Sequence, residues 1–349
     1  MNCCAECFSS PYLKDIINRN GFKGNCEFCL SSDIFIYDTN ELSLIFQNIL
    51  DLYSVNNEIG SKIELQIEID FPNKIFSSKI VEERRSDLLK SIIENDFESY
   101  SHLFENNVIF TFVNNSVGDE LINPLQISWK KFADEIKSTN RFHIQNTLDL
   151  DKLKILLNRY SKPIHKGKIF YRGRISTNVG YDIYNMGNPS SEKAKSGRAN
   201  PTGISYLYLA DQLETTLYET RASLLDYVSI GQFRLKEDIK VVNLRGNLYD
   251  PILLAENEEL EDFMIHLPFI TKLEMELSKP NRRNDIELDY LPTQYLSEFI
   301  KSIGYDGVEY QSSLYSEGYN LAIFKVDKFE CINVELHEIC KIKFTHNQL

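Results

Sequence analysis

The sequence contains no stretch of eighteen consecutive apolar residues, which a membrane-spanning helix would need. Its first residues, MNCCAECFSSPYLKD, also lack the basic segment followed by an apolar core that marks a secretory signal. These two absences predict a soluble cytoplasmic protein without a membrane partner.

Common nucleotide-binding motifs are absent as well. No G-x-G-x-x-G opens a strand-to-helix turn and no Walker lysine loop is present, so the sequence supports neither a Rossmann fold nor a P-loop. No serine, histidine and acid follow one another in an order that indicates a hydrolase triad. A dinucleotide would therefore have to be held by another arrangement of side chains.

Positive charge is in the minority. The 349 residues include 38 Lys and Arg against 51 Asp and Glu, a formal net charge of -13. Nucleic-acid backbones repel such a chain at long range, so nucleic acid is not expected as a partner. A local basic pocket remains compatible with this balance, and Arg172, Arg174 and Arg198 are candidates for it.

Cysteine is scarce after residue 30 and crowded before it. Five of the seven cysteines lie in the first thirty positions, which is not a distributed disulfide framework. Cys4-x2-Cys7 and Cys26-x2-Cys29 are separated by eighteen residues, a spacing typical of a tetrahedral structural zinc site. The sequence therefore predicts one structural Zn²⁺ on these four thiolates, with Cys3 as an alternative to Cys4.

The length predicts more than one domain. We expect a zinc-binding module over 1–32, a mostly helical domain over 33–150 and a mixed α+β domain over 151–349. Within the second of these, VEERRSDLLKSIIEND and LQISWKKFADEIKS have the apolar spacing of amphipathic helices. SKIELQIEIDF alternates between apolar and polar residues, which predicts an extended segment.

The pattern changes after Lys168 to short strands and helices. Their irregular order is typical of an α+β fold rather than a doubly wound one. YVSIGQFRL and IKVVNL are expected to be strands of a hairpin.

Residues 196–219 combine a loop, a strand and a helix in close succession. Turn-forming residues surround Arg198, so we expect it on a constrained loop. Residues 204–210 alternate like a largely buried strand. Asp211 is the expected N-cap of a short helix that has Glu219 near its end.

The ordered motifs G-R, x-N-P-x-G, Y-L-Y-L-A and E-T-T-L-Y-E resemble the core of the RES domain family, named for an Arg, a Glu and a Ser. The Arg, Tyr and Glu that line the family's NAD pocket correspond here to Arg198, Tyr208 and Glu219. YDGVEYQSSLYSEGYNLAIF resembles the later Ser-bearing segment, which places that serine at Ser312 with Ser313 as the alternative.

An earlier YRGR resembles the Arg-bearing first strand of the family, which makes Arg172 and Arg174 further candidates for NAD binding. The resemblance covers about residues 165 to 335 and implies a fold akin to the ADP-ribosyltransferase toxins. Ala199 departs from the family, because many members carry an aromatic residue after the G-R pair.

The resemblance implies an enzyme that cleaves NAD at the nicotinamide–ribose bond. Arginines would bind the diphosphate and Glu219 would stabilise the oxocarbenium ion, while water, phosphate or a protein side chain serves as the acceptor. Such an enzyme needs restraint by an antitoxin, a trigger protein or its own N-terminal domain, as in a toxin or phage-defence effector. The sequence is also compatible with a homo-oligomer.

The region before the RES-like segment resembles an N-terminal domain that is grouped with the HEPN helical domains. HEPN ribonucleases use an Arg and a His four to six residues apart, and Arg159 and His165 approach this pattern. Pro163 lies between them and makes the pattern weak. A HEPN-type ribonuclease and a non-catalytic nucleotide-binding sensor are therefore the alternative functions.

Overall fold

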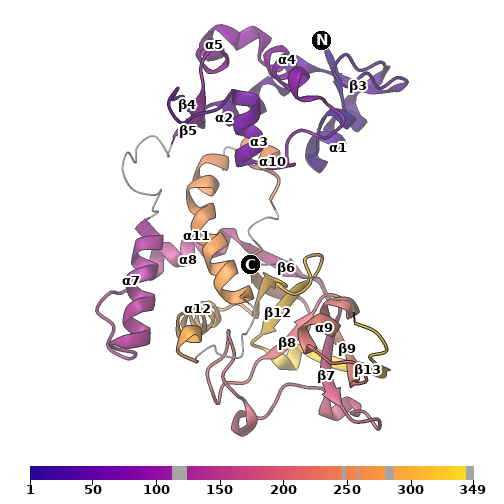
Figure 1. The fold of residues 1–349 in the computed structure, drawn as a ribbon, viewed down its shortest axis with the longest axis vertical. Helices are drawn as coiled ribbons and strands as arrows, with labels where there is room; N and C mark the ends of the chain where they lie inside the picture. Colours follow the sequence, from indigo (N-terminus) through magenta and orange to yellow (C-terminus); the bar gives the residue numbers. More distant parts are fainter. Residues whose placement is uncertain (112–123, 246–248, 258, 280–286, 343–349) are drawn as a thin grey trace. The chain divides into compact units, whose positions relative to one another are not determined.

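The computed structural model describes residues 1–111, 124–245, 249–257, 259–279 and 287–342. The chain forms two compact units (Figure 1). The first unit comprises Met1–Asn123 and Leu248–Pro268, and the second comprises Pro124–Asn247 and Phe269–Leu349. The domain boundaries expected at 32/33 and 150/151 stay a prediction.

The N-terminus of the first unit is a small sheet beside a helix. The three strands pair antiparallel in the order β1-β3-β2. Helix α1 begins with Pro11 after Ser10, whose hydroxyl accepts a hydrogen bond of 3.1 Å from the Leu13 amide. These elements are β1 (Asn2–Cys4), α1 (Pro11–Asn20), β2 (Phe22–Gly24) and β3 (Ile34–Asp38).

The rest of the first unit is mostly helical, as the sequence predicted. One core joins its helices to the N-terminal sheet. The larger elements are α2 (Ser43–Leu50), β4 (Tyr53–Val55), α3 (Ile63–Asp70), α4 (Glu82–Ile92), α5 (Phe97–Glu105), β5 (Val108–Phe110) and α10 (Pro251–Glu256). The extended segment expected over SKIELQIEIDF is wrong, because α3 forms there. Ile63 and Ile67 are four residues apart and both are buried, so these apolar residues lie together on one face of the helix.

A later segment of the chain returns to complete the first unit. The Asp250 carboxylate accepts a hydrogen bond of 2.7 Å from the Ser10 hydroxyl and one of 3.0 Å from the Ile252 amide. Lys74 donates to the Tyr249 carbonyl at 2.9 Å. The first unit is therefore built from two stretches of sequence.

The second unit is built on an eight-stranded mixed sheet with the order β13-β9-β7-β8-β12-β11-β10-β6. Its strands are β6 (Ser161–Ile164), β7 (Ile169–Ser176), β8 (Leu207–Ala210), β9 (Tyr227–Leu235), β10 (Ile239–Asn243), β11 (Gly307–Gln311), β12 (Tyr319–Ile323) and β13 (Phe329–Glu338). The hairpin expected between β9 and β10 is wrong. β9 pairs with β7 and β13, whereas β10 pairs with β6 and β11.

Separate cores cover the two faces of this sheet. Helices α7 (Pro124–Ser138), α8 (Leu150–Arg159) and α12 (Leu291–Ser302) share one core with Val308 and Ala322. Leu209, Leu321 and neighbouring strand residues form the core on the opposite face. The mixed α+β class and the helical N-terminal part are thus confirmed.

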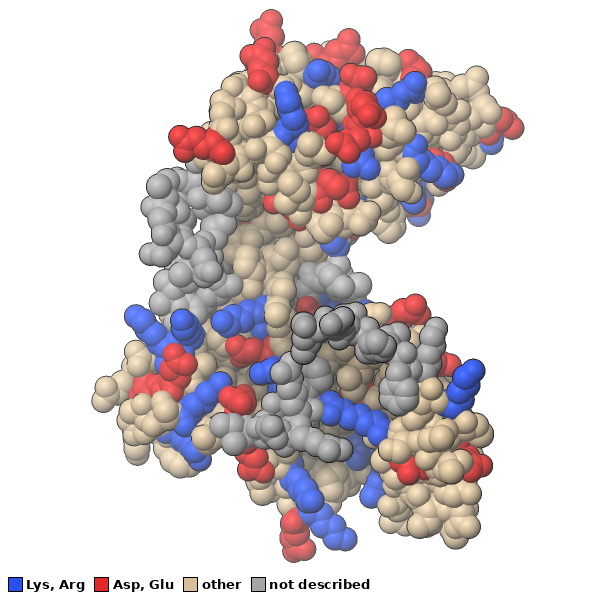
Figure 2. Space-filling model, viewed as in Figure 1, with Lys and Arg blue, Asp and Glu red and all other residues tan. Residues whose placement is uncertain are grey.

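Two further helices belong to this architecture. α11 (Leu260–Ser278) contributes residues to both units and contains Pro268, while α9 (Leu213–Thr220) packs on β7. Within the described ranges, no helix combines the length and the apolar character that crossing a bilayer requires. Figure 2 shows acidic and basic side chains interspersed on the face that it draws.

Candidate functional site

A cavity of about 490 Å³ lies in the second unit, beside the middle of β7 and the end of β8. These strands are paired at Tyr171 and Ala210, and the cavity wall continues from there onto α9 and the loop before β8. The polar and charged lining residues are Tyr171, Arg172, Arg198, Tyr208, Thr216, Glu219, Thr220, Arg221, Ser278, Lys279, Tyr310, Ser313 and Asn320. Among the described lining residues, four cationic side chains thus accompany one carboxylate.

Hydrogen bonds from α12 fix the backbone of the loop that carries Arg198. The Gln294 side-chain amide donates to the Gly197 carbonyl at 2.8 Å and to the Asn200 carbonyl at 3.1 Å. Thr293 donates to the Arg198 carbonyl at 2.7 Å. A Cβ on Gly197 would lie 2.6 Å from the Asn200 Oδ1 atom, so the loop closes this tightly only around glycine. The expectation of a constrained loop is confirmed.

Arg198 itself lies along the cavity wall. Its guanidinium is 4.8 Å from the centre of the Tyr290 ring, and Nη1 donates to the Glu276 carbonyl at 3.4 Å. A cation stacked on an aromatic ring is restricted in orientation while it keeps its charge. The arginine is therefore positioned to bind an anion in the cavity.

Arg172 is the second cation in the wall, and it is poorly satisfied by the protein. Nη1 donates to the Tyr208 carbonyl at 3.2 Å, whereas Nε is buried and has no hydrogen-bond partner among the described residues. Burial, together with the nearby charge of Arg174, lowers the pKa of Arg172 to about 10. The side chain still carries its charge at neutral pH, and an anion in the cavity would supply the missing partner.

Glu219 lies in the last turn of α9 and is fixed by two donors. The Ser312 hydroxyl donates to Oε1 at 2.7 Å, and the Asn320 side-chain amide donates to the same oxygen at 2.8 Å. Among the residues that the structure describes, no hydrogen bond to Oε2 is found. This oxygen is available to a ligand in the cavity.

The two serines of the predicted pair have different positions. Ser312 is 2% exposed and accepts hydrogen bonds from the Tyr315 amide at 3.1 Å and the Leu314 amide at 3.3 Å while it donates to Glu219. Ser313 lines the cavity. Ser312 is thus placed to orient the carboxylate, and Ser313 to touch a ligand.

Tyr208 contributes to the wall, but the loop engages its hydroxyl. The hydroxyl donates to the Asn200 Oδ1 atom at 2.7 Å and accepts from the Ala199 amide at 3.3 Å. Burial raises the pKa of Tyr208, so the phenol stays neutral. The Ala199 side chain is buried in the core rather than in the cavity wall.

Arg174 does not line the cavity. Its guanidinium lies 4.2 Å from the centre of the Tyr181 ring, and its Nη1 donates to the Asn185 carbonyl. Arg172 and Arg174 are two residues apart on β7 and share a face of the strand, but the contacts with Tyr181 and Asn185 hold the Arg174 guanidinium away from the cavity lining. The structure therefore brings Arg172, but not Arg174, to the cavity.

Sequence reasoning missed Tyr310 and Asn320. They are directly opposite each other on β11 and β12, and both line the cavity. The strand pattern around them was visible, but the register that pairs these two residues was not. Likewise, the N-cap of α9 is Gln212 rather than Asp211, whose carboxylate instead accepts from Thr215 at 2.8 Å and from the Tyr319 amide at 3.0 Å.

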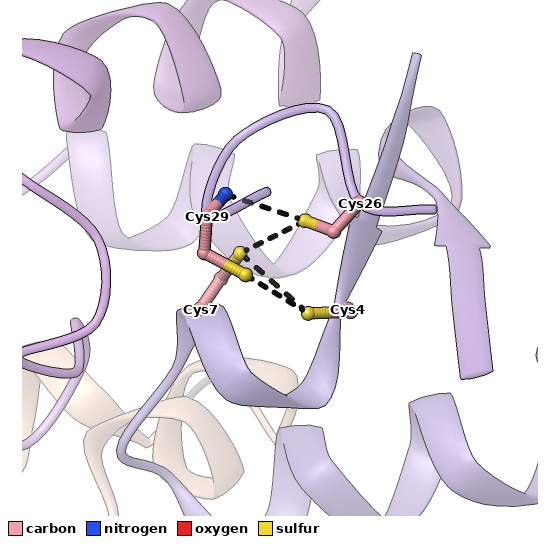
Figure 3. A group of neighbouring side chains, drawn as sticks. All are labelled: Cys4, Cys7, Cys26 and Cys29. Atoms are coloured by element: carbon pink, nitrogen blue, oxygen red, sulfur yellow. Dashed lines mark hydrogen bonds between the residues drawn. The ribbon is translucent and has the colours of Figure 1, made fainter. Parts of the chain in front are cut away.

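In the first unit, four cysteines converge as the sequence predicted (Figure 3). All four sulfur atoms of Cys4, Cys7, Cys26 and Cys29 lie within 4.8 Å of one another. Zinc–sulfur bonds of about 2.3 Å in a tetrahedron place the sulfurs about 3.8 Å apart, so the cluster has the right size for such an ion. Cys3 points elsewhere, with its sulfur 3.6 Å from the Tyr37 carbonyl.

The thiols of this cluster are electrostatically coupled. Hydrogen bonds to Cys26 and Cys4, together with burial, raise the pKa of Cys7. Four neighbouring sulfurs cannot all carry negative charge unless a cation compensates them. The donor set therefore fits a metal ion that prefers sulfur.

The residues of the ribonuclease alternative lie apart from the cavity lining. Arg159 is the last residue of α8, and His165 follows β6. His165 is largely exposed, with Nδ1 3.2 Å from a carboxylate oxygen of Asp238. Neither residue lines the cavity.

Comparison with known protein families finds a match, most of which lies in the second unit. Residues 174–345 match the family model described as the RES domain. No curated protein matches the chain. The crystal structure of the M. tuberculosis MbcT-MbcA toxin-antitoxin complex contains a chain that is 14% identical, with a TM-score of 0.30 over 54% of this chain and 93% of that one. Such a TM-score is too low to establish a common fold.

Proposed function

We propose that residues 174–345, which match the RES domain model, make the protein a toxin-type enzyme that cleaves NAD at the nicotinamide–ribose bond. The observation that carries the proposal is the carboxylate of Glu219. Two donors hold one of its oxygens at the wall of a cavity that also contains Arg172 and Arg198.

The carboxylate suits the charge that develops in this reaction. As the carbon–nitrogen bond breaks, its electron pair goes to the cationic nicotinamide ring, which leaves as a neutral molecule. Positive charge then develops on the ribose, and the Glu219 carboxylate stabilises it. Because the leaving group needs no proton, one carboxylate suffices where glycoside hydrolysis uses two.

The arginines suit the other end of the substrate. A guanidinium donates two parallel hydrogen bonds to a phosphate and keeps its charge at neutral pH. Arg172 has a buried Nε that no described residue of the protein bonds, and Arg198 is fixed on its rigid loop. We assign both arginines to the diphosphate of NAD. Tyr208 and Ser313 are assigned as further contacts in the cavity wall, and Ser312 as the residue that orients Glu219.

We assign the cysteine cluster to one structural Zn²⁺. All four positions of a tetrahedral site would be occupied by Cys4, Cys7, Cys26 and Cys29, which leaves no position for a catalytic water. The ion would supply folding energy to the small N-terminal sheet and take no part in the cleavage of NAD.

An enzyme that consumes NAD in the cytoplasm harms its own cell unless it is restrained. We propose that an antitoxin, a trigger protein or the first unit provides the restraint, in the setting of a toxin or phage-defence effector. The relation of the first unit to the HEPN domains, the likeness to ADP-ribosyltransferases and the formation of a homo-oligomer remain predictions.

The test is to incubate the purified protein with NAD, with and without phosphate, and to identify the products. We expect free nicotinamide, and the second product reports whether water or phosphate is the acceptor. Glu219→Gln keeps the shape of the side chain and removes its charge, so turnover should fall by about a hundredfold or more. Glu214→Gln, on the same helix but outside the cavity lining, is the matched control and should leave turnover unchanged.

Wild-type turnover in the Glu219→Gln variant would remove this residue from the reaction. The ribonuclease alternative makes the opposite forecast in cells. It requires RNA fragmentation before any loss of NAD, toxicity that is lost with His165→Ala and toxicity that survives Arg198→Ala.

A further inference from the structure

A cluster of charged and polar residues lies on the face of the sheet opposite the cavity. Tyr310 and Asn320 pair across β11 and β12 and line the cavity. Side chains alternate along a strand, so Glu309 and Gln311 point to the other face. Leu321, the partner of Glu309 in register, accordingly belongs to the core on that side.

Glu309 is the buried centre of this cluster. Its side chain is 0% exposed, and Oε1 accepts hydrogen bonds from Lys162 Nζ at 2.8 Å and Arg245 Nη1 at 3.4 Å. Oε2 is buried, and no residue within the described ranges forms a hydrogen bond with it. Desolvation offsets much of the attraction within a buried ion pair. A contribution to the stability of the fold is therefore a weak explanation for this arrangement.

Arg245 connects Glu309 to the loop at the cavity. Its Nε donates to Gln311 Oε1 at 3.0 Å. The Gln311 amide nitrogen donates to the Ser316 carbonyl and to the Gly318 carbonyl, each at 2.7 Å. These bonds join the start of the loop over residues 312–318 to its end.

The same loop is locked against the helix that carries Glu219. A Cβ on Gly318 would lie 1.8 Å from Thr215 Oγ1, so loop and helix are in close contact at this point. The rings of Tyr218 and Tyr315 stack with their centres 5.1 Å apart. Any shift of the loop would therefore reach Ser312 and the carboxylate that its hydroxyl orients.

We propose that Gln311 is a positioning residue for Glu219, itself oriented by Arg245 and Glu309 from the far side of the sheet. This inference rests on the proposed cleavage of NAD. Gln311 fixes the loop, the loop fixes Ser312, and Ser312 holds one oxygen of the carboxylate.

Gln311→Glu tests the central link. A glutamate still accepts from Arg245 but cannot donate to the two loop carbonyls. We expect kcat to fall by about tenfold to a hundredfold, as for a misplaced catalytic group, with little change in KM for NAD. A kcat equal to that of the wild type would overturn the proposal.

A matched pair tests the origin of the effect. Arg245→Met and Lys162→Met each remove one cation from Glu309, but of these two cations it is Arg245 that bonds Gln311. We expect Arg245→Met to lower kcat like Gln311→Glu, and Lys162→Met to retain the wild-type kcat. Equal losses in both variants would show that the cluster acts through general stability, which contradicts a positioning role.

Hydrogen exchange of the loop gives a readout that needs no turnover. The amides of residues 312–318 should exchange faster in Gln311→Glu and Arg245→Met, and at the wild-type rate in Lys162→Met. Unchanged exchange in the first two variants would overturn the inference. If the wild type failed to release nicotinamide, the proposed function would fail, whereas these exchange rates would still decide whether Gln311 fixes the loop.

Discussion

The charged side chain of Arg172 destabilises the folded protein. Its guanidinium is partly buried and close to the charge of Arg174, and its Nε finds no partner in the part of the chain that the structure describes. Folding disfavours its charged form, as the lowered pKa of about 10 shows. At neutral pH the charge of Arg172 therefore opposes folding, and this destabilising effect weakens only as the pH rises through the folded-state pKa of about 10. Residues that oppose folding in this way are common where a ligand binds.

Arg172→Met should therefore separate stability from function. We expect the apparent Kd for NAD to rise by about tenfold or more, because a charge-assisted contact is lost. The Tm of the ligand-free protein should stay the same or rise by a few degrees. Calorimetry and NAD titration measure both quantities. Arg174→Met is the control, since that side chain does not line the cavity, and a larger loss of affinity there would reverse the assignment.

Individual site residues were predictable when a motif fixed their position in the chain. Arg198, Tyr208 and Glu219 follow one another within a short ordered stretch, and all three line the cavity. Tyr310 and Asn320 were missed because their role depends on the register between two strands. A sequence pattern shows that strands exist, but it does not show which residues they place opposite each other.

At the scale of elements, Gly173 sets the distance between β7 and α9. A Cβ at this position would lie 2.4 Å from Thr220 Cγ2 and 2.8 Å from Thr216 Cγ2. Gly173→Ala should push the helix away and displace Glu219, which we expect to lower kcat by about tenfold or more. The overpacking should also cost roughly 1 to 3 kcal/mol of stability.

Two further variants make this prediction specific. Gly187→Ala introduces the same methyl group where nothing lies within 4 Å, and it should leave kcat unchanged. Adding Thr220→Ser to Gly173→Ala removes the methyl group of the closest contact and keeps the hydroxyl. This double variant should recover part of the lost activity, and an absence of any recovery would argue against a steric origin.

The small N-terminal sheet depends on the cysteine cluster. We expect close to one zinc per chain by metal analysis, and a strong chelator should lower the Tm of the first unit, because metal binding supplies much of the folding energy of so small a module. Cys26→Ser should lose the metal, whereas Cys340→Ser, an exposed residue outside the cluster, should keep it. Well under one zinc per chain in protein purified without chelator would contradict the assignment.

Helices whose own residues show a clear apolar spacing were predicted better than elements that depend on segments distant in the sequence. The helices α4 and α7 appear where apolar residues recur at helical spacing. α3 was missed because the apolar residues of a short alternating segment can lie on one face of a strand or on one face of a helix. β9 and β10 were assigned to one hairpin because they are adjacent in sequence, but each found its partners elsewhere in the sheet.

At the scale of the whole molecule, the second unit extends further toward the N-terminus than the RES-like motifs indicate. Trp129, Phe132 and Ile136 of α7 are buried in its core. A chain that begins at residue 151 should therefore be less stable than one that begins at residue 124, by about 3 kcal/mol or more, given the cost of removing buried aromatic side chains.

Urea unfolding of the two truncated chains measures this difference. Both retain residues 248–268 without the rest of the first unit, so the comparison isolates residues 124–150. Equal unfolding midpoints would show that α7 is dispensable. NAD cleavage that appears only after the first unit is removed would support its role as a restraint.

The return of residues 248–268 to the first unit has a consequence for the nascent chain on the ribosome. The first unit has all of its residues once position 268 has emerged, whereas Ser312 and Asn320 of the cavity are synthesised later. At about 5–20 residues per second, translation from 268 to 312 takes roughly 2 to 9 s. An antitoxin that recognises the first unit could therefore bind during translation, before the catalytic site is complete.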